Sequence, residues 1–226
     1  MKNPWSNLPL NPPFVLEIDR SAVTEFNRGQ SVESNATLQT HLFPEPFLGT
    51  PTAPIVLLGL NPGFSGLDST WHRDPDFLTA MRKNLNHDCE FFPFLDPRFE
   101  KTPGSVWWRK RLRWLIDDTA VELVSRSIFC IELLGYHSTR FKGVPKQISE
   151  NRLLPSAEYA GHLVRTAIAN NKFIVVMRSY RRWCKLVPEL VEYKNVFHLN
   201  SPQNVALSPA NLPGYEQLKA VIQDRQ

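Results

Sequence analysis

Four short apolar runs divide the chain and predict the strands of a single sheet. They occupy residues 54–60, 127–134, 172–179 and 195–202. Stretches with helical periodicity separate or follow them, at 76–85, 104–126, 156–171, 180–187 and 213–222. Strands that alternate with helices need crossover connections, which place helices on both faces of a parallel sheet. The pattern therefore predicts an α/β fold, a three-layer α/β/α sandwich with a four-stranded parallel central sheet.

The first fifty residues have a different pattern. They contain one helix-like stretch, at 21–28, and six prolines, at positions 4, 9, 12, 13, 44 and 46. Proline removes a backbone donor and favours extended chain. We expect residues 1–50 to form a Pro-rich arm that packs on a domain spanning residues 51–226.

The first apolar run ends abruptly in the segment Gly59-Leu60-Asn61-Pro62-Gly63-Phe64-Ser65. Glycine and proline end a buried strand, and asparagine tolerates unusual backbone angles. Ligands of open α/β sheets bind beyond the carboxyl ends of the strands. Asn61 is therefore a candidate site residue.

A carboxylate interrupts the second apolar run at Glu132. An unpaired buried glutamate costs several kcal/mol, so this side chain either reaches the open end of the strand or has partners there. Two interpretations remain: a residue of the site, or a structural glutamate held in an ion pair.

Three segments resemble motifs of the uracil-DNA glycosylase superfamily. The segment 59–65 is similar to the first catalytic motif in the form used by the mismatch-specific (thymine/uracil) branch, and Phe92-Pro93-Phe94 is similar to that branch's base-stacking segment. The segment 200–204 resembles the second motif, with its Ser and Pro exchanged. Either Asn200 or His198 leads that motif. The resemblance covers roughly residues 45–222 as an ordered set of strand ends.

The resemblance implies a monofunctional DNA glycosylase that hydrolyses the N-glycosidic bond of a flipped-out base. Asn61 would hold the attacking water, and Asn200 would act from the second motif. The residues expected to bind the base are Gly63, Phe64, Phe94, Glu132 and His198. Those expected to contact DNA are Ser201, Gln203, Asn204, Arg109, Lys110 and Arg181.

Two departures from the uracil pattern suggest another base. Gly63 stands where the best-known branch has a tyrosine that blocks the C5 side of the pyrimidine, and Glu132 stands where that branch has an amide. A carboxylate accepts from an N4 amino group and repels O4 of uracil. We expect a uracil or a modified base, with a C5-substituted cytosine as the hypothesis, in base excision repair or in defence against modified phage DNA.

Charge and cysteine content narrow the expected partners. The chain has 26 Lys and Arg against 22 Asp and Glu, a net charge of +4, which is compatible with a DNA partner of either strandedness. The basic run at 109–113 is either a solvated helix face or a phosphate contact. Three cysteines without a CxxC motif predict neither a metal nor another cofactor.

Location and alternative functions follow from what the sequence lacks. No apolar run approaches the roughly 20 residues of a membrane span, and residues 1–13 lack the apolar segment of a secretory signal. We expect a cytoplasmic, nucleoid-associated monomer.

Another interpretation is a weak or inactive DNA- or lesion-binding module of the same fold. A third, an unrelated α/β hydrolase or nucleotide-binding protein, lacks GxSxG, Walker and GxGxxG motifs.

Overall fold

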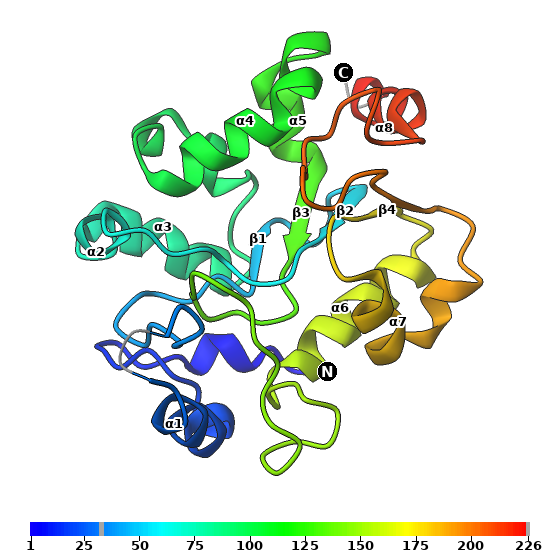
Figure 1. Cartoon of the computed structure of the whole chain (residues 1–226). Helices are drawn as coiled ribbons and strands as arrows, with labels where there is room; N and C mark the ends of the chain where they lie inside the picture. Colours follow the sequence, from blue (N-terminus) through cyan, green and yellow to red (C-terminus); the bar gives the residue numbers. More distant parts are fainter. Residues whose placement is uncertain (32–33, 225–226) are drawn as a thin grey trace.

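A five-stranded sheet occupies the centre of the protein (Figure 1). The computed structural model describes residues 1–31 and 34–224, and within them the strand order is β1-β3-β2-β4-β5. Strands β2, β3, β4 and β5 are parallel, and β1 runs antiparallel to β3. The strands are β1 (Phe47–Gly49), β2 (Ile55–Leu58), β3 (Ile128–Ile131), β4 (Phe173–Val176) and β5 (Val196–His198). The predicted α/β class is confirmed.

The predicted number of strands is wrong, because β1 was not recognised. All four predicted strands are present and parallel, but the sheet has a fifth, antiparallel strand at its edge. This strand has only three residues and follows Pro44 and Pro46, so it carries no alternation from which a strand could be read. The strand lies within residues 1–50, which therefore contribute to the sheet as well as packing on the domain.

Helices flank the sheet, with α3, α4 and α5 on one side of the view in Figure 1 and α6 and α7 on another. The single helix expected at 104–126 is two helices, because the chain leaves helical geometry at Thr119 (φ −131°, ψ −104°). The helices are α1 (Arg20–Arg28), α2 (Asp68–Trp71), α3 (Pro75–Leu85), α4 (Pro103–Asp118), α5 (Val121–Ser127), α6 (Ala157–Ala169), α7 (Tyr180–Leu186) and α8 (Tyr215–Gln223). Within the described part of the chain, none of them combines the length and apolar character that a bilayer crossing requires.

The register of the central strands aligns their carboxyl ends. Leu58 of β2 pairs with Ile131 of β3 on one side and with Val176 of β4 on the other. The residues that follow these three strands therefore lie at the same edge of the sheet. Every residue of the three strands is buried, so their apolar side chains form the core on both faces.

The amino-terminal segment is anchored through a buried carboxylate. Asp19 is completely buried and accepts hydrogen bonds from the Tyr136 hydroxyl (2.8 Å) and from the Ser156 backbone N–H (3.0 Å). The same hydroxyl accepts a hydrogen bond from the Leu16 N–H at 3.1 Å. Residues just before α1 are thereby joined to the loop after β3 and to the start of α6.

Candidate functional site

A cavity of about 260 Å³ lies beyond the carboxyl ends of β2 and β3. Five of the residues predicted for the site line it: Asn61, Gly63, Phe64, Phe94 and Glu132. Pockets that bind small molecules typically have volumes of roughly 300–1,000 Å³, apolar walls and a few polar groups. This cavity lies close to the lower end of that range, and we refer to it as the pocket.

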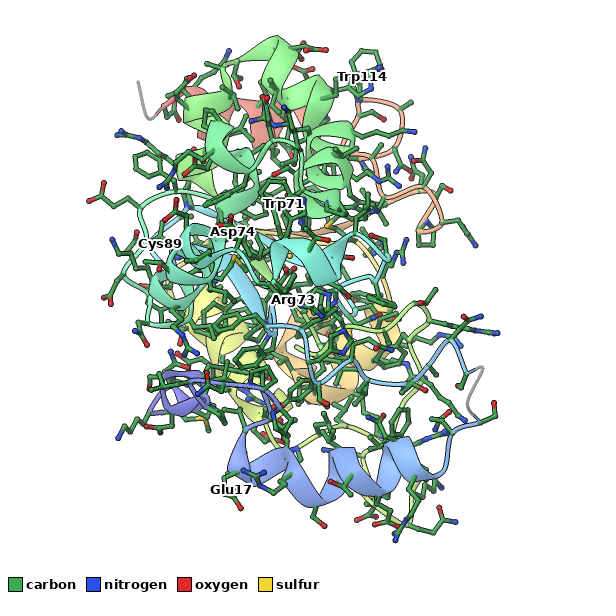
Figure 2. The ribbon with its side chains drawn as sticks, turned by 90° about the vertical axis from the view of Figure 1, so that its left-hand side faces the viewer. Glu17, Trp71, Arg73, Asp74, Cys89 and Trp114 are labelled. Carbon is green, nitrogen blue, oxygen red and sulfur yellow. The ribbon has the colours of Figure 1, made fainter. Side chains whose placement is uncertain are left out.

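Aromatic side chains that were not predicted form much of the pocket wall. They are Trp71, at the end of α2, Phe77 of α3, and Trp107 and Trp108 of α4. Trp107 and Trp108 meet edge to face, with ring centroids 4.8 Å apart. Figure 2 shows Trp71 near the middle of the view and Trp114, farther along α4, at its outer edge. Aromatic spacing alone does not reveal these roles, since buried aromatics of this kind are usual in cores.

Asn61 is held so that one side of its amide remains available. Its Nδ2 donates to the backbone oxygens of Pro62 (2.9 Å) and Ser138 (3.0 Å) and approaches the Ser138 hydroxyl oxygen at 3.1 Å. Three oxygen atoms around one nitrogen fix the orientation of the amide, because an amide oxygen could not donate to them. The Asn61 Oδ1 is therefore the atom that can accept a hydrogen bond from a ligand or a water.

Glu132 lies directly after β3, with its carboxyl group packed against the backbone of Gly59. A Cβ atom at Gly59 would stand 2.2 Å from Glu132 Oε2, so only glycine leaves room for the carboxyl group. Oε1 has a weak contact with Cys130 Sγ at 3.9 Å, and Oε2 is buried without a hydrogen-bond partner. The structural interpretation, an ion-paired glutamate, does not describe this arrangement, since neither oxygen has a salt-bridge partner within 4.0 Å among the described residues.

Burial raises the pKa of Glu132 from its ordinary value of 4.5 to about 7, and the nearby Arg178 opposes that rise. Arg178 follows β4 and was not predicted as a site residue. The sequence did contain a signal, because a basic residue directly after an apolar strand lies at the edge where the other candidates lie. At neutral pH Glu132 is divided between its protonated and ionised forms.

Phe94 lies in the short helical turn η3 (Pro93–Leu95) and is buried beside the pocket. The start of α4 packs closely on its ring, because a Cβ atom at Gly104 would be 2.4 Å from it. The neighbouring phenylalanines differ. Phe92 is completely buried against Trp108, with ring centroids 4.9 Å apart, and Phe91 is exposed. Phe92 is therefore a core residue, whereas Phe94 belongs both to the core and to the pocket wall.

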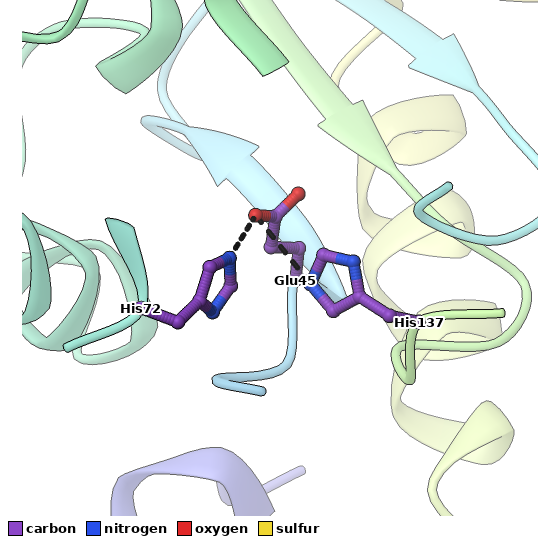
Figure 3. A group of neighbouring side chains, drawn as sticks. All are labelled: Glu45, His72 and His137. Carbon is purple, nitrogen blue, oxygen red and sulfur yellow. Dashed lines mark ion pairs between the residues drawn. The ribbon is translucent and has the colours of Figure 1, made fainter. Parts of the chain in front are cut away.

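Three further polar side chains meet at the floor of the pocket: Glu45, His72 and His137 (Figure 3). Glu45 precedes β1, His72 follows α2, and His137 lies in the loop after β3. Glu45 Oε1 is 3.8 Å from His72 Nε2 and 3.6 Å from His137 Nε2, and all three side chains are buried. They lie 27 to 92 residues apart in sequence, so no local motif signals them.

Two histidines and a carboxylate are a donor set used for metal ions, and the ligand atoms of this cluster lie within 4.8 Å of one another. The hydrogen bonds do not fit a metal. A histidine that binds metal through one nitrogen normally donates its other N–H to an acceptor. His72 Nδ1 instead accepts the Phe43 N–H at 2.8 Å, which leaves the ring proton on Nε2, the atom directed at Glu45.

The residues of the predicted second motif do not line the pocket. Asn200 is exposed, and its Nδ2 donates to the Ala210 oxygen at 3.0 Å. His198 is also exposed, with its ring 4.8 Å from that of Tyr180. Ser201, Gln203 and Asn204 belong to a loop that the buried Asn211 holds in place through bonds to the Ser201 N–H (2.8 Å) and the Ala206 oxygen (2.9 Å).

The basic residues predicted to contact DNA divide into two kinds. Lys110 on α4 and Arg181 on α7 are exposed. Arg109 is half-buried and donates from Nη2 to the Leu95 oxygen at 2.9 Å, so it supports the turn that carries Phe94. Arg111, the next residue but one, lies over the Trp107 ring at 4.7 Å. Its backbone oxygen accepts from Leu207 N–H, which joins α4 to the loop after β5.

The chain was compared with protein-family models, with curated proteins and with solved structures. None of the three comparisons finds a match.

Proposed function

We propose that this protein is a monofunctional DNA glycosylase of the uracil-DNA glycosylase type, with the three-layer α/β/α fold of that superfamily. The observation that carries the proposal is the meeting of Asn61, Phe94 and Glu132 in one aromatic-walled pocket. The three residues come from segments far apart in the sequence. The motif resemblance implies that Asn61 holds the attacking water, Phe94 stacks on the base and Glu132 contacts the edge of the base. A pocket of this kind suits a planar base turned out of the DNA stack.

The attacking group is a water bound by Asn61. Its Oδ1 accepts a hydrogen bond from the water, since Nδ2 is committed to backbone and hydroxyl oxygens. An amide positions water and is a poor base, so catalysis depends on alignment and on the departure of the base. A slow enzyme is expected. The proposed N-glycosylase reaction uses only residues of the site and needs no cofactor.

The base edge is read by Glu132. When protonated, its carboxyl group donates to N3 of a cytosine-type base and accepts from the N4 amino group. When ionised, it accepts only, which remains compatible with an N4 amino group and opposes a carbonyl such as O4 of uracil. A pKa of about 7 makes both forms available near neutrality. We favour a cytosine-derived base for this reason.

Room for a C5 substituent is the second element of the specificity. A Cβ atom built at Gly63 would meet nothing within 4 Å, so this side of the pocket is open. A base with a bulky C5 group is thus the proposed substrate, and modified phage DNA is one source of such bases. Base excision repair is the other context, and a cytoplasmic, nucleoid-associated monomer suits either.

One observation favours a second candidate, a catalytically weak DNA- or lesion-binding module. Asn200 and His198, which would complete the catalytic set, are exposed and do not line the pocket. A protein that retains the base pocket without the second motif would bind a flipped base and release it unchanged.

A panel of end-labelled oligonucleotides separates the two candidates. Each carries one uracil, thymine mismatch, hypoxanthine, hydroxymethylcytosine or glucosylated hydroxymethylcytosine, alongside modified phage DNA. Wild type and Asn61→Ala are assayed for alkali-labile abasic sites. We expect release of at least one base, lost in Asn61→Ala. Tight DNA binding with no release from any substrate would replace the glycosylase by the binding module.

A further inference from the structure

His137 has an oxygen acceptor at each of its ring nitrogens. Nδ1 is 2.6 Å from the Gly63 backbone oxygen, and Nε2 is 3.0 Å from the Phe43 backbone oxygen and 3.6 Å from Glu45 Oε1. Carbonyl oxygens accept hydrogen bonds and cannot donate them. A neutral imidazole has a single N–H, so one nitrogen would face an oxygen with lone pair against lone pair. Both contacts are satisfied only by the doubly protonated ring.

His72, whose ring lies 5.0 Å from that of His137, is in the opposite situation. Its Nδ1 accepts the Phe43 N–H at 2.8 Å, so a neutral ring with its proton on Nε2 satisfies its surroundings. Burial lowers the pKa of His72 well below its ordinary value, and the neighbouring His137 and His41 add to that effect. The backbone of Phe43 thus distinguishes the two rings, because its N–H meets one and its oxygen meets the other.

We propose that His137 is held as an imidazolium paired with Glu45, and that this buried pair is the device that positions the Asn61 loop. Glu45 supplies the negative charge without which a buried cation would be costly. Its Oε1 is 3.6 Å from His137 Nε2 and 3.8 Å from His72 Nε2, and the neutral His72 directs its N–H towards it (Figure 3).

The surrounding charges act on this pair in both directions. Burial lowers the pKa of His137, and the nearby His41 lowers it further. The Gly63 and Phe43 oxygens and Asp68 raise it in part. Burial also raises the pKa of Glu45, and Asp68 and Glu132 raise it further. The net pKa shift of each side chain favours its neutral form, so the charged pair is inferred from the two oxygen acceptors around the His137 ring and from the proximity of Glu45 to that ring.

The positioning effect follows from the hydrogen bonds of two consecutive residues. His137 holds the Gly63 oxygen, and Ser138 N–H donates to the Pro62 oxygen at 3.2 Å. The backbone and hydroxyl oxygens of Ser138 also accept hydrogen bonds from the Asn61 Nδ2. Residues 61, 62 and 63 are therefore each tied to the loop after β3. Removing the Nδ1 proton of His137 would release one of these three ties.

The test is heteronuclear NMR of the wild-type protein labelled with ¹⁵N in its histidine rings, recorded across pH. His137→Gln and His72→Gln spectra assign the signals by their loss, and His162→Gln provides a control at a half-exposed histidine of α6. We expect two directly protonated ring nitrogens for His137 near neutrality and one, Nε2, for His72. An unprotonated ring nitrogen in His137 at that pH would overturn the proposal.

Metal binding is tested on the same protein by titration with Zn²⁺. The proposal expects no stoichiometric binding that depends on Glu45, since the cluster already holds its protons. One equivalent of Zn²⁺ bound by wild type and lost in Glu45→Gln would overturn it in favour of a metal site.

The role in positioning rests on the proposed function, whereas the charge state does not. If base release is found, we expect His137→Gln to lower kcat on the order of a hundredfold, the typical effect of misplacing a catalytic group by about 1 Å, with KM changed little. In wild type, kcat would also fall as a rising pH removes a proton from His137. An unchanged kcat in the variant would refute the positioning role. A doubly protonated His137 in a protein that releases no base would leave the charge assignment intact and refute only the glycosylase.

Discussion

Glu132 connects the chemistry of the pocket to the stability of the fold. The residue is 9% exposed, one carboxyl oxygen is buried without a hydrogen-bond partner, and the pKa is raised from 4.5 to about 7. A raised pKa means that the folded protein binds the proton more tightly than the unfolded chain does. The resulting stabilisation is fully present below pH 4.5 and is lost as the pH rises through about 7.

We therefore expect Glu132→Gln to change how stability depends on pH. The shift corresponds to about 3 kcal/mol at about 1.4 kcal/mol per pKa unit. The free energy of unfolding of wild type should fall by about that amount, relative to the variant, between pH 4.5 and pH 8. Urea unfolding at several pH values measures it. A constant difference between the two proteins would show that Glu132 has an ordinary pKa in the folded state.

Under the proposed function, Gly63 leaves room in the pocket for a C5 substituent on the base. We expect Gly63→Tyr to abolish release of C5-substituted bases and to spare unsubstituted ones, because the ring would occupy the open side of the pocket. Gly66→Ala is the matched control, since a Cβ there also meets nothing within 4 Å and Gly66 does not line the pocket. The oligonucleotide panel measures both. Equal loss on all substrates would indicate that the loop, rather than the substituent, is disturbed.

At the scale of elements, the segment before α1 depends on one hydroxyl group. Tyr136→Phe would leave the Leu16 N–H and one oxygen of Asp19 without their partner in a buried environment. Each unsatisfied buried group costs about 1–3 kcal/mol, so for these two groups we expect a loss of about 2–6 kcal/mol in the free energy of unfolding. Urea denaturation measures it.

Tyr193→Phe is the control for that experiment. Its hydroxyl group is half-buried and donates to a single acceptor, the Lys172 oxygen at 2.5 Å, so a smaller loss of about 1 kcal/mol is expected. Similar losses in the two variants would mean that the contacts of the amino-terminal segment add nothing to stability beyond an ordinary hydrogen bond.

Element boundaries also show which local signals are reliable. The helices expected at 156–171 and 180–187 match α6 and α7 closely, because apolar periodicity marks them. The break at Thr119 and the strand β1 were missed. A change of helix direction and the pairing of a three-residue edge strand both depend on contacts with distant segments, here Phe47 with Ile131 across the sheet.

At the scale of the whole molecule, the position of the exposed basic residues matters more than the net charge. The net charge of +4 is modest, but Lys110 and Arg113 are exposed on α4, the helix whose first turns line the pocket. Figure 2 shows Trp114 of this helix at one end of the view and Glu17, beside α1, at the other. Phosphate contacts are therefore expected near α4 rather than near α1.

Binding of DNA should be salt-dependent, and its dependence should change with α4. We expect the double variant Lys110→Ala and Arg113→Ala to reduce the slope of log K against log salt concentration by about 1–2, near 0.7–0.9 per phosphate contact. Fluorescence anisotropy with labelled oligonucleotides measures the slope. Arg20→Ala on α1 is the control and should leave it unchanged. Equal changes in both proteins would mean that binding reflects net charge alone.

The sequence by itself determined the α/β class, the four parallel strands and five of the residues that line the pocket. The class, the strands, Asn61 and Glu132 follow from local features, because an apolar run that ends in Gly and Asn, or a carboxylate near the end of such a run, marks a strand end. Parallel pairing then brings such ends to one edge, as Leu58, Ile131 and Val176 do. Gly63, Phe64 and Phe94 were expected only from the motif resemblance.

Only the tertiary structure decided the floor and the wall of the pocket. Glu45, His72 and His137 come from three separate segments, and their meeting depends on how β1 and the loops after α2 and β3 pack. The tertiary structure also places Asn200 and His198 outside the pocket. The motif resemblance had predicted that both would lie beside the base. Contacts between distant segments are set by packing of the whole chain, and neither periodicity nor motif spacing encodes them.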